Sequence, residues 1–464
     1  MPSESSPSSV PEGAKQGGSV RDRWSWAEPA VWTDRMLETL ERGVKGGKWF
    51  SLIDKVYSVR NLRASWEKVR RNRGAAGVDR QSVARFDGKS EEYLAELSSS
   101  LETGQYHPTA VLRQWIDKPG TSKKRPLGIP TVKDRVVQGA LRHVLEPLWE
   151  AEFADHSYGF RPGRGCKDAL RRVQQLLDEG QTWVVDADIT SFFDTIDHDR
   201  LMKEVEKIVS DGRVLDLIRR FLNQSILEGM SEWQPERGTP QGAVISPLLA
   251  NIFLHPVDVA LKRGGFEVVR YADDLVILCQ SREEAQRALS ELSAQIAELG
   301  LSLHPEKTKL VDATARGGFD FLGYHFERGL RWPREKSQAA FKDKVRAKTP
   351  RNPGRSLCQI VEELNPVLRG WFGYFRHSHK SVLITLDKWV RMRLRSILRN
   401  FTKRKGRGRG HDHFRWPNAY FRDLGLFIFQ DAREALVQSR CGNHRPESRM
   451  REICTSGLEG GEPG

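Results

Sequence analysis

The stretch FEVVRYADDLVILC, from Phe266 to Cys279, gives the clearest indication of the fold. Two runs of apolar and β-branched residues lie on either side of Ala272, Asp273 and Asp274. Apolar runs of this length, interrupted by a short polar segment, are typical of a β-hairpin. The sequence therefore predicts a hairpin with two adjacent carboxylates at its tip.

A further strand is predicted upstream at WVVDADI, from Trp183 to Ile189. Because successive side chains of a strand point to opposite faces, Val184, Asp186 and Asp188 are expected to share one face. Two carboxylates thus lie on the same side of this strand. We expect the strand to neighbour the hairpin, which would bring Asp188 close to the acidic tip.

Helical patterns alternate with these strands. Between Lys133 and Trp149, apolar residues recur with the spacing of one helix face. A helix is also expected directly after the hairpin, because Ser281 and Glu284 fit a capping box. Strands and helices intermix up to about residue 330, so the sequence predicts an α+β fold for this region.

The chain beyond Arg331 is rich in helix-forming residues and in Arg and Lys. A helix predicted from Leu383 to Phe401 places its apolar residues on one side and Arg391, Arg395 and Arg399 on another. We therefore expect a helical domain to follow the α+β region.

The chain of 464 residues is strongly basic, with 75 Lys and Arg against 61 Asp and Glu and a formal charge of +14. Such an excess favours nucleic acid as the partner, with a merely soluble basic protein as the alternative. No apolar stretch is long enough to span a membrane and no secretory signal is present, so we expect a cytoplasmic protein. The five cysteines are scattered without a C-x-x-C pair, which argues against a disulfide framework or a four-cysteine zinc site.

Three carboxylates, those of Asp188, Asp273 and Asp274, form the candidate catalytic group. Oxygen ligands of this kind hold Mg²⁺, and two such ions about 4 Å apart support in-line phosphoryl transfer. Clustered carboxylates repel one another, so cations between them best explain such a group. The alternative is three separate solvated acids.

These features belong to a longer series of motifs that resembles the reverse transcriptase/maturases encoded by group II introns, in the form that lacks an endonuclease. The resemblance covers roughly residues 57 to 405. Its motifs, in the order of that family, are NLRASWEKVRRNRGAAGVD, KKRPLGIPTVKDRVVQGAL, HSYGFRPGRGC, VVDADITSFFDTIDH, GTPQGAVISPLLANIFLH, VRYADDLVIL, LSLHPEKTKL, FDFLGYHF and, beyond the polymerase blocks, LNPVLRGWFGYFRHS. The resemblance implies a right-hand polymerase, with fingers, a palm of antiparallel β-sheet and helices, and an α-helical thumb/maturase domain.

The resemblance also implies how the chain is divided. The expected parts are a disordered tail (1–20), an N-terminal extension (21–86), the fingers and palm of a reverse transcriptase (87–330), the helical thumb or maturase domain X (331–402) and a basic, DNA-binding-like C-terminal tail (403–464). From Trp416 onward the sequence has no paired C-x-x-C motifs and no H-N-H pattern, so we expect no HNH endonuclease.

By motif, the resemblance assigns the catalytic role to Asp188, Asp273 and Asp274. Together with Ile189, these residues are expected to bind two Mg²⁺ ions, for which Mn²⁺ is a possible substitute. The residues expected to bind the incoming nucleotide are Lys124, Arg125, Phe193, Gln241, Gly242 and Lys307.

Three of these nucleotide assignments carry alternatives. Phe193 is expected under the incoming sugar, where it would exclude a 2′-hydroxyl, but one of the pair Phe192 and Phe193 is expected to be core. A surface lysine is the alternative for Lys307. Which of the cations Lys123 to Arg125 contacts the triphosphate stays open.

A further set is expected to contact the template or intron RNA, because aromatic rings and arginines can stack on bases and neutralise phosphates. Its members are Arg161, Gly163, Arg369, Trp371, Tyr374, Arg376, Lys403, Arg404 and Lys405. The alternatives are that about half of the aromatic residues pack among thumb helices and that the basic run from Lys403 is a solvated linker.

The function implied is an RNA-directed DNA polymerase encoded by a group II intron. It would also act as a maturase that assists splicing, and it would support intron mobility by target-primed reverse transcription. The expected partners are intron RNA, an RNA template with a DNA primer or target DNA, and dNTPs, with a homodimer left open and a nucleoid-associated location in a bacterium. The alternatives are a stand-alone or domesticated reverse transcriptase, used in defence or retron-like, and a maturase that only assists splicing.

Overall fold

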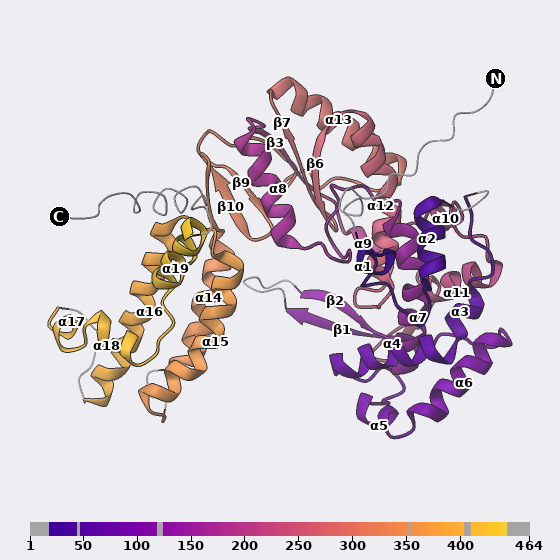
Figure 1. Cartoon of the computed structure of the whole chain (residues 1–464), viewed down its shortest axis with the longest axis horizontal. Coiled ribbons are helices and arrows are strands. Elements are labelled where there is room, and N and C mark those ends of the chain that lie inside the picture. Colours follow the sequence, from indigo (N-terminus) through magenta and orange to yellow (C-terminus); the bar gives the residue numbers. More distant parts are fainter. Residues whose placement is uncertain (1–17, 44–46, 118–123, 351–353, 403–409, 443–464) are drawn as a thin grey trace, which may run out of the picture. The chain divides into compact units, whose positions relative to one another are not determined.

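The computed structural model describes residues 18–43, 47–117, 124–350, 354–402 and 410–442 (Figure 1). The chain divides into two compact units. The first runs to Leu322 and includes Glu327–Gly329, and the second comprises Gly323–Phe326 and the chain from Leu330 onward. Each unit has a hydrophobic core of its own and is described by itself.

The first unit begins with helices that pack around the long helix α7 (Val132–Glu150). These helices are α1 (Val20–Arg23), α2 (Asp34–Arg42), α3 (Ile53–Tyr57), α4 (Val59–Asn72), α5 (Val83–Asp87) and α6 (Ser90–Glu102). Both faces of α7 are largely buried, which fits the predicted apolar pattern between Lys133 and Trp149. The closest neighbour of α7 is α4, which buries Leu62, Trp66 and Val69.

A first sheet has the strand order β2-β1-β4-β5. Its strands are β1 (Val111–Asp117), β2 (Lys124–Ile129), β4 (Ile226–Glu228) and β5 (Ser231–Trp233). The long β1–β2 pair is antiparallel and extends away from the helices, as Figure 1 shows, whereas β1 and β4 are parallel. The last four positions of β1 and the first two of β2 are exposed, so this end of the hairpin presents side chains to solvent rather than to the core.

The second sheet carries the predicted acidic hairpin and has the order β6-β7-β3-β8. Its strands are β3 (Trp183–Asp188), β6 (Glu267–Tyr271), β7 (Asp274–Cys279) and β8 (Lys309–Asp312). Both the hairpin and the upstream strand are therefore confirmed, and β3 pairs with β7 in antiparallel register. Helices and strands intermix throughout this unit, which confirms the α+β class.

Helices cover this second sheet (Figure 1). Those in contact with it are α8 (Cys166–Asp178), α12 (Ser246–Arg263) and α13 (Arg282–Glu298). The side chain of Ser281 caps α13 by accepting a hydrogen bond from the Glu284 main-chain nitrogen, as the capping pattern predicts. The remaining elements of this unit are α9 (Phe192–Thr195), α10 (His198–Val205), α11 (Gly212–Leu222) and β9 (Phe319–Phe321).

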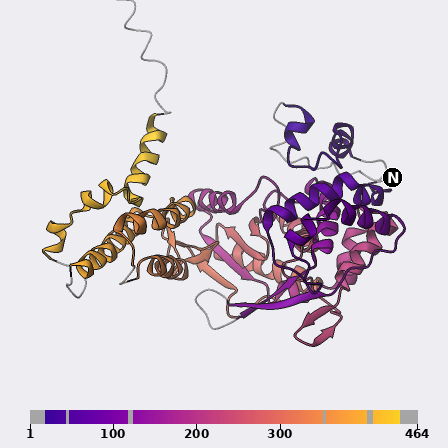
Figure 2. The ribbon, with the colours of Figure 1, turned by 90° about the horizontal axis from the view of Figure 1, so that it is seen from below.

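The second unit consists mainly of helices, which Figure 2 shows in orange and yellow. Its elements are β10 (Tyr324–Glu327), β11 (Leu330–Pro333), α14 (Glu335–Lys348), α15 (Leu357–Phe375), α16 (Lys380–Phe401), α17 (Asp412–Arg415), α18 (Asn418–Asp423) and α19 (Phe429–Gly442). Its core is mostly aliphatic, and within it Phe372 stacks on Phe429 with ring centroids 6.0 Å apart.

The basic side predicted for α16 is partly internal. Arg391 and Arg395 are 8% and 2% exposed, because each lies against other parts of the second unit. The Arg395 guanidinium donates to the carbonyl of Trp416 and to Asn418 Oδ1, both at 2.9 Å. These arginines therefore hold the helical unit together and are not an open cationic face.

Candidate active site

The central feature of the site is a pair of carboxylates at one end of the second sheet. Asp188 ends β3 and Asp274 begins β7, and the antiparallel register places the two directly opposite each other. Residues paired in this way have Cβ atoms about 4.5–5.5 Å apart. Asp273 lies in the two-residue turn before β7, so the structure brings all three predicted aspartates to one end of the sheet.

The carboxylates create a locally negative field. Burial raises the pKa of Asp273, and the charge of Asp188 raises it further, whereas Arg270 and Lys307 act in the opposite direction. Asp186, on the same strand as Asp188, has its pKa raised to about 7 by burial and then by the charges of Asp274 and Asp320. Such shifts arise where anions lie close together without enough positive charge between them.

One cation already contacts this group. Lys307 Nζ lies 2.7 Å from Asp188 Oδ2, in the segment that follows α13. The main chain fixes that segment, because the His304 nitrogen donates to the Asp188 carbonyl at 2.7 Å and Leu303 bridges to Ile189. Lys307 and Ile189 therefore both lie beside the catalytic candidates.

The donor chemistry of this end of the sheet suits a divalent cation. Carboxylate oxygens are preferred by hard ions, and a cation would offset the repulsion that raises these pKa values. Among the described residues, no three acidic, His or Cys side chains already converge as a ready-made metal cluster. The three aspartates are thus candidate ligands by chemistry and position, and Lys307 currently shares one oxygen of Asp188.

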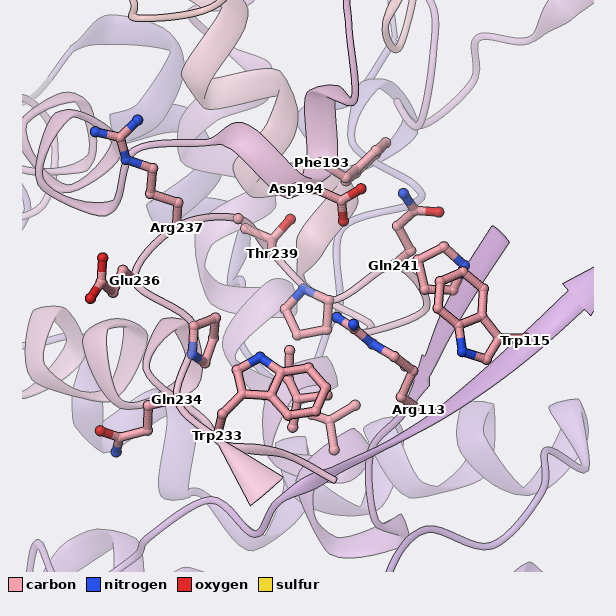
Figure 3. A pocket seen from close by; sticks show the side chains of 17 residues that line it. Arg113, Trp115, Phe193, Asp194, Trp233, Gln234, Glu236, Arg237, Thr239 and Gln241 are labelled. Carbon is pink, nitrogen blue, oxygen red and sulfur yellow. The ribbon is translucent and has the colours of Figure 1, made fainter. Parts of the chain in front are cut away.

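A cavity of about 530 Å³ lies between the first sheet and the loop that precedes α12 (Figure 3). Asp188, Asp273 and Asp274 are not among the described residues that line it. Phe193 and Gln241 line it, together with Arg113 and Trp115 of β1 and Thr239. Arg113 and Trp115 could not be singled out from the sequence, because single polar or aromatic positions on a strand carry no motif, whereas Thr239 belongs to the motif that carries Gln241. The cavity joins two of the predicted nucleotide-binding residues to a polar and aromatic wall.

The two neighbouring phenylalanines differ in burial. Phe192 is only 2% exposed and belongs to the core, whereas Phe193 is half-buried and lines the cavity. Their rings meet edge to face with centroids 5.3 Å apart. The expectation that one member of the pair is core is therefore met by Phe192, and Phe193 is the one available to a ligand.

Gly242 allows two backbone segments to approach closely. Its φ is +113°, and a Cβ at this position would lie 2.6 Å from the carbonyl oxygen of Gly128. The Gly128 nitrogen also donates to the Gln241 carbonyl at 2.7 Å. A glycine is required here because this contact fixes the loop that carries Gln241 against β2.

The predicted triphosphate-binding cations lie apart from this cavity. Lys124 and Arg125 begin β2, are exposed, and pair with Asp117 and Ile116 of β1. Neither is among the described residues that line the cavity. Lys123, the third cation of that run, lies outside the described residues.

The structure corrects the prediction that Arg161 contacts RNA. Its guanidinium is buried and donates to both carboxylate oxygens of Glu150, at 2.9 and 2.8 Å, and to the carbonyls of Ala154 and Ser157. Every nitrogen of this side chain is thus used internally. Gly163 has a left-handed backbone conformation, with a φ of +69°.

The predicted RNA contacts of the second unit divide by exposure. Arg369 is exposed, with its guanidinium 5.7 Å from the centre of the Phe427 ring, and Arg376 is half-exposed. Trp371 packs against Phe341 with ring centroids 4.8 Å apart, so the structure favours the packing alternative for Trp371.

Tyr374 is half-buried. Its main-chain carbonyl accepts a hydrogen bond from the Tyr324 hydroxyl at 2.8 Å. The contacts predicted for Lys403, Arg404 and Lys405 lie outside the described residues.

Two family models match the chain. The model described as "Reverse transcriptase (RNA-dependent DNA polymerase)" matches residues 116–326, which include the second sheet, the three aspartates and the part of the cavity wall from Pro126 onward. The model described as "Group II intron, maturase-specific domain" matches residues 338–416, in the helical unit. The fold and site therefore define a polymerase of the reverse transcriptase class, with the right-hand architecture of that class, joined to a maturase-specific domain.

Curated relatives specify the class further. Group II intron-encoded protein LtrA of Lactococcus lactis subsp. cremoris is 42% identical over 172 residues, which are 37% of this chain and 28% of LtrA. Protein YkfC of Escherichia coli K12 is 34% identical over 291 residues, covering 54% of this chain and 76% of YkfC. A 91 kDa protein in the cob intron of Schizosaccharomyces pombe is 40% identical, covering 49% of this chain and 35% of that protein. The chain belongs to the family of group II intron-encoded reverse transcriptase/maturases, and it matches less than a third of the length of LtrA.

Reverse transcriptases as a family use divalent metal ions, and the carboxylate donors of the three aspartates are of the kind that such ions prefer. Within the described part of the chain, no helix has both the length and the apolar character needed to cross a bilayer.

Proposed function

We propose that the protein is an RNA-directed DNA polymerase that adds deoxynucleotides to a DNA primer on an RNA template. The observation that carries this proposal is the cross-strand pair of Asp188 and Asp274, with Asp273 in the adjoining turn. A sheet end with three carboxylates suits nucleotidyl transfer better than RNA binding alone, which needs no metal ligands. A cavity of nucleotide size lies in the same unit.

Asp188, Asp273 and Asp274, with Ile189 beside them, would hold two Mg²⁺ ions, for which Mn²⁺ is a substitute. Bound there, the ions would lower the pKa of the primer 3′-hydroxyl and neutralise the triphosphate and the departing pyrophosphate. Lys307 holds an ammonium 2.7 Å from Asp188 Oδ2, from which it can bind a phosphate oxygen or give a proton to the leaving group.

The cavity residues would position the incoming dNTP. The exposed edge of Phe193 would lie under the sugar and exclude a 2′-hydroxyl, which favours deoxyribonucleotides. Gln241, held against Gly128, would contact the nucleotide, and Gly242 keeps the backbone close enough for that contact. Lys124 and Arg125 lie on the exposed β1–β2 hairpin and would bind the triphosphate if that hairpin closes over it.

A second activity is favoured by the maturase-specific match over residues 338–416. We propose that the helical unit binds the intron RNA and promotes its folding for splicing, while the intron itself supplies the splicing chemistry. The formal charge of +14 and the exposed Arg369 support an RNA partner. Intron mobility would then follow by reverse transcription primed at a DNA target.

Two assays on the same preparations test both activities. The purified protein is added to a transcript spanning its own gene and flanks, at Mg²⁺ too low for self-splicing, and ligated exons are measured. The same protein is tested for cDNA on a primed RNA template, with Asp273→Ala as the active-site variant. Asp312→Ala is the matched control, because Asp312 lies on the same sheet but pairs with Trp183 at the opposite end of β3.

The proposal predicts that wild type and both variants promote splicing, and that only Asp273→Ala fails to make cDNA. Splicing by none of the proteins, with cDNA made by wild type, would leave a stand-alone reverse transcriptase. Splicing by all three without any cDNA would leave a maturase that only assists splicing.

A further inference from the structure

The turn that presents Asp273 and Asp274 contains a residue in an unfavourable conformation. Ala272 has a φ of +60°, at the first position of the two-residue loop between β6 and β7. Glycine is the usual residue where such a loop needs a positive φ, because a Cβ is strained there. A non-glycine residue keeps this conformation only when its surroundings hold it.

A buried arginine contacts this turn from behind. Arg270, on β6, is 1% exposed, and its Nε and Nη2 donate to the two carboxylate oxygens of Asp258. Its Nη1 donates to the Ala272 carbonyl at 2.9 Å and to Asn251 Oδ1 at 3.0 Å. One rigid guanidinium thus links the strained residue of the turn to two side chains of α12.

The same helix also holds the other side of the turn. Asn251 Nδ2 donates to the Gly159 carbonyl at 2.8 Å, and a Cβ on Gly159 would lie only 2.3 Å from the Ala272 nitrogen. The main chain of Arg270 is hydrogen-bonded on both sides to residues 156–158, at 2.9 and 2.8 Å. The turn is therefore clamped between the Gly159 segment and Arg270, with Asn251 connecting the two.

Stability alone does not explain the buried ion pair between Arg270 and Asp258. Both side chains are fully buried, with side-chain exposures of 1% and 0%, and His156 Nε2 lies 3.5 Å from Asp258 Oδ1. Replacing such a buried pair by apolar residues is often neutral or stabilising, because desolvation of two charges is costly. An apolar pair could not, however, donate a hydrogen bond to the Ala272 carbonyl.

We propose that Arg270 is a positioning residue for nucleotidyl transfer: by fixing the Ala272 carbonyl, it holds Asp273 and Asp274 in the arrangement that binds the catalytic divalent ions. This inference rests on the proposed polymerase function. Lysine cannot replace arginine here, because a single ammonium cannot bridge Asp258, Asn251 and Ala272 in one plane.

The full chain is tested as Arg270→Lys, with Arg395→Lys as the matched control. Arg395 is also buried and also donates to a main-chain carbonyl and an asparagine oxygen, those of Trp416 and Asn418, but in the helical unit. For each protein we would measure the melting temperature, kcat and KM for dNTP, and the affinity for Mn²⁺ by loss of the free-ion electron paramagnetic resonance signal. Asp273→Ala defines the part of the Mn²⁺ binding that belongs to the site.

Arg270→Lys should lower kcat and weaken site-specific Mn²⁺ binding, each by about 10-fold to 100-fold, as loss of a residue that orients metal ligands typically does. The KM for dNTP should stay within about threefold, since the cavity does not contact Arg270. Arg395→Lys should lose stability while keeping kcat and Mn²⁺ affinity. If Arg270→Lys keeps both quantities, or if Arg395→Lys loses them equally, Arg270 is only structural and the proposal is wrong.

Two further measurements keep the outcome clear. If Arg270→Lys does not fold, Asn251→Ala replaces it. That variant leaves Arg270 paired with Asp258 but removes Asn251 Oδ1, the second acceptor of Nη1, together with the link to Gly159. An unchanged kcat and Mn²⁺ affinity would then overturn the proposal. If the wild type makes no cDNA, the polymerase proposal fails by itself. Mn²⁺ affinity alone then decides the positioning role, which falls if Arg270→Lys binds Mn²⁺ as the wild type does.

Discussion

Asp188 and Asp274 are directly opposite each other in the antiparallel pairing of β3 and β7. Like charges at such positions destabilise a sheet, so the pair is not explained by folding. Lys307 contacts Asp188, through a bond of 2.7 Å to Oδ2. The cross-strand pair of Asp188 and Asp274 thus links the sheet to the proposed chemistry.

The two phenylalanines after β3 should respond differently to truncation. Phe193→Ala should raise the incorporation of ribonucleotides relative to deoxyribonucleotides by more than about 10-fold, because the wall that excludes the 2′-hydroxyl is lost. Phe192→Ala should instead lower the free energy of unfolding by about 3 kcal/mol or more, because its ring is in the core. Competitive incorporation assays and urea titrations of both variants check this. A selective effect at Phe192 with none at Phe193 would reverse the assignment.

A methyl group at Gly242 should damage nucleotide use. Gly242→Ala places a Cβ against the Gly128 carbonyl, which displaces the loop carrying Gln241, and kcat/KM for dNTP should fall roughly 10-fold to 100-fold. Gly180→Ala is the control, since Gly180 also has a positive φ, +92°, but open space around its Cβ position. That control should lose about 1 kcal/mol of stability and no activity. Equal kinetic losses in both variants would mean that strain alone is measured.

Arg161 should matter for stability and not for RNA affinity. Arg161→Met leaves Glu150 buried without its partner, which should cost about 3–5 kcal/mol. The double variant Arg161→Met/Glu150→Leu should recover most of that loss. Its affinity for a primed RNA template, and the dependence of that affinity on salt, should equal those of the wild type. A shallower salt dependence in the double variant would restore the prediction that Arg161 contacts phosphate.

The buried His143 should make stability dependent on pH. Burial lowers the pKa of His143 to about 3, and the charges of Lys68 and Arg142 act in the same direction. Below about pH 6.5 the unfolded chain binds a proton that the folded chain does not bind until about pH 3, so stability falls as the pH decreases between these values.

From pH 7 to pH 5 this histidine should account for a loss of about 2 kcal/mol, which His143→Gln should abolish. Urea unfolding of both proteins at the two pH values measures the difference. An equal loss in the variant would show that other groups set the pH dependence.

Local sequence pattern was enough for much of the fold. The apolar runs around Ala272 predict the two strands of a hairpin, and the alternation from Trp183 predicts a third strand, because the two faces of a strand differ in polarity. All three strands are present. The long amphipathic pattern before Trp149 likewise predicts α7. These patterns depend only on neighbouring residues, so a single sequence contains them.

The predictions that the structure corrects concern basic residues whose contact partners are distant in the sequence. Arg161 forms an ion pair with Glu150 of α7, and Arg395 donates hydrogen bonds to Trp416 and Asn418. The repeat pattern of a helix or strand does not reveal such contacts. A basic residue therefore suggested a nucleic-acid surface where the fold uses it internally. The proposed role of Arg270 could not be predicted for the same reason, because it depends on the contacts of Arg270 with α12 and with the strained turn.

The central claim is that the paired carboxylates of β3 and β7 perform nucleotidyl transfer. The most direct measurement is the single-turnover rate of adding one dNTP to a primer on an RNA template in Mg²⁺, for wild type, Asp188→Asn and Asp274→Asn, with melting temperatures recorded alongside. Our account predicts that each variant loses more than about 100-fold in rate while remaining folded, because each loses a ligand that stabilises charge in the transition state. A rate within about tenfold of wild type for either folded variant would contradict it.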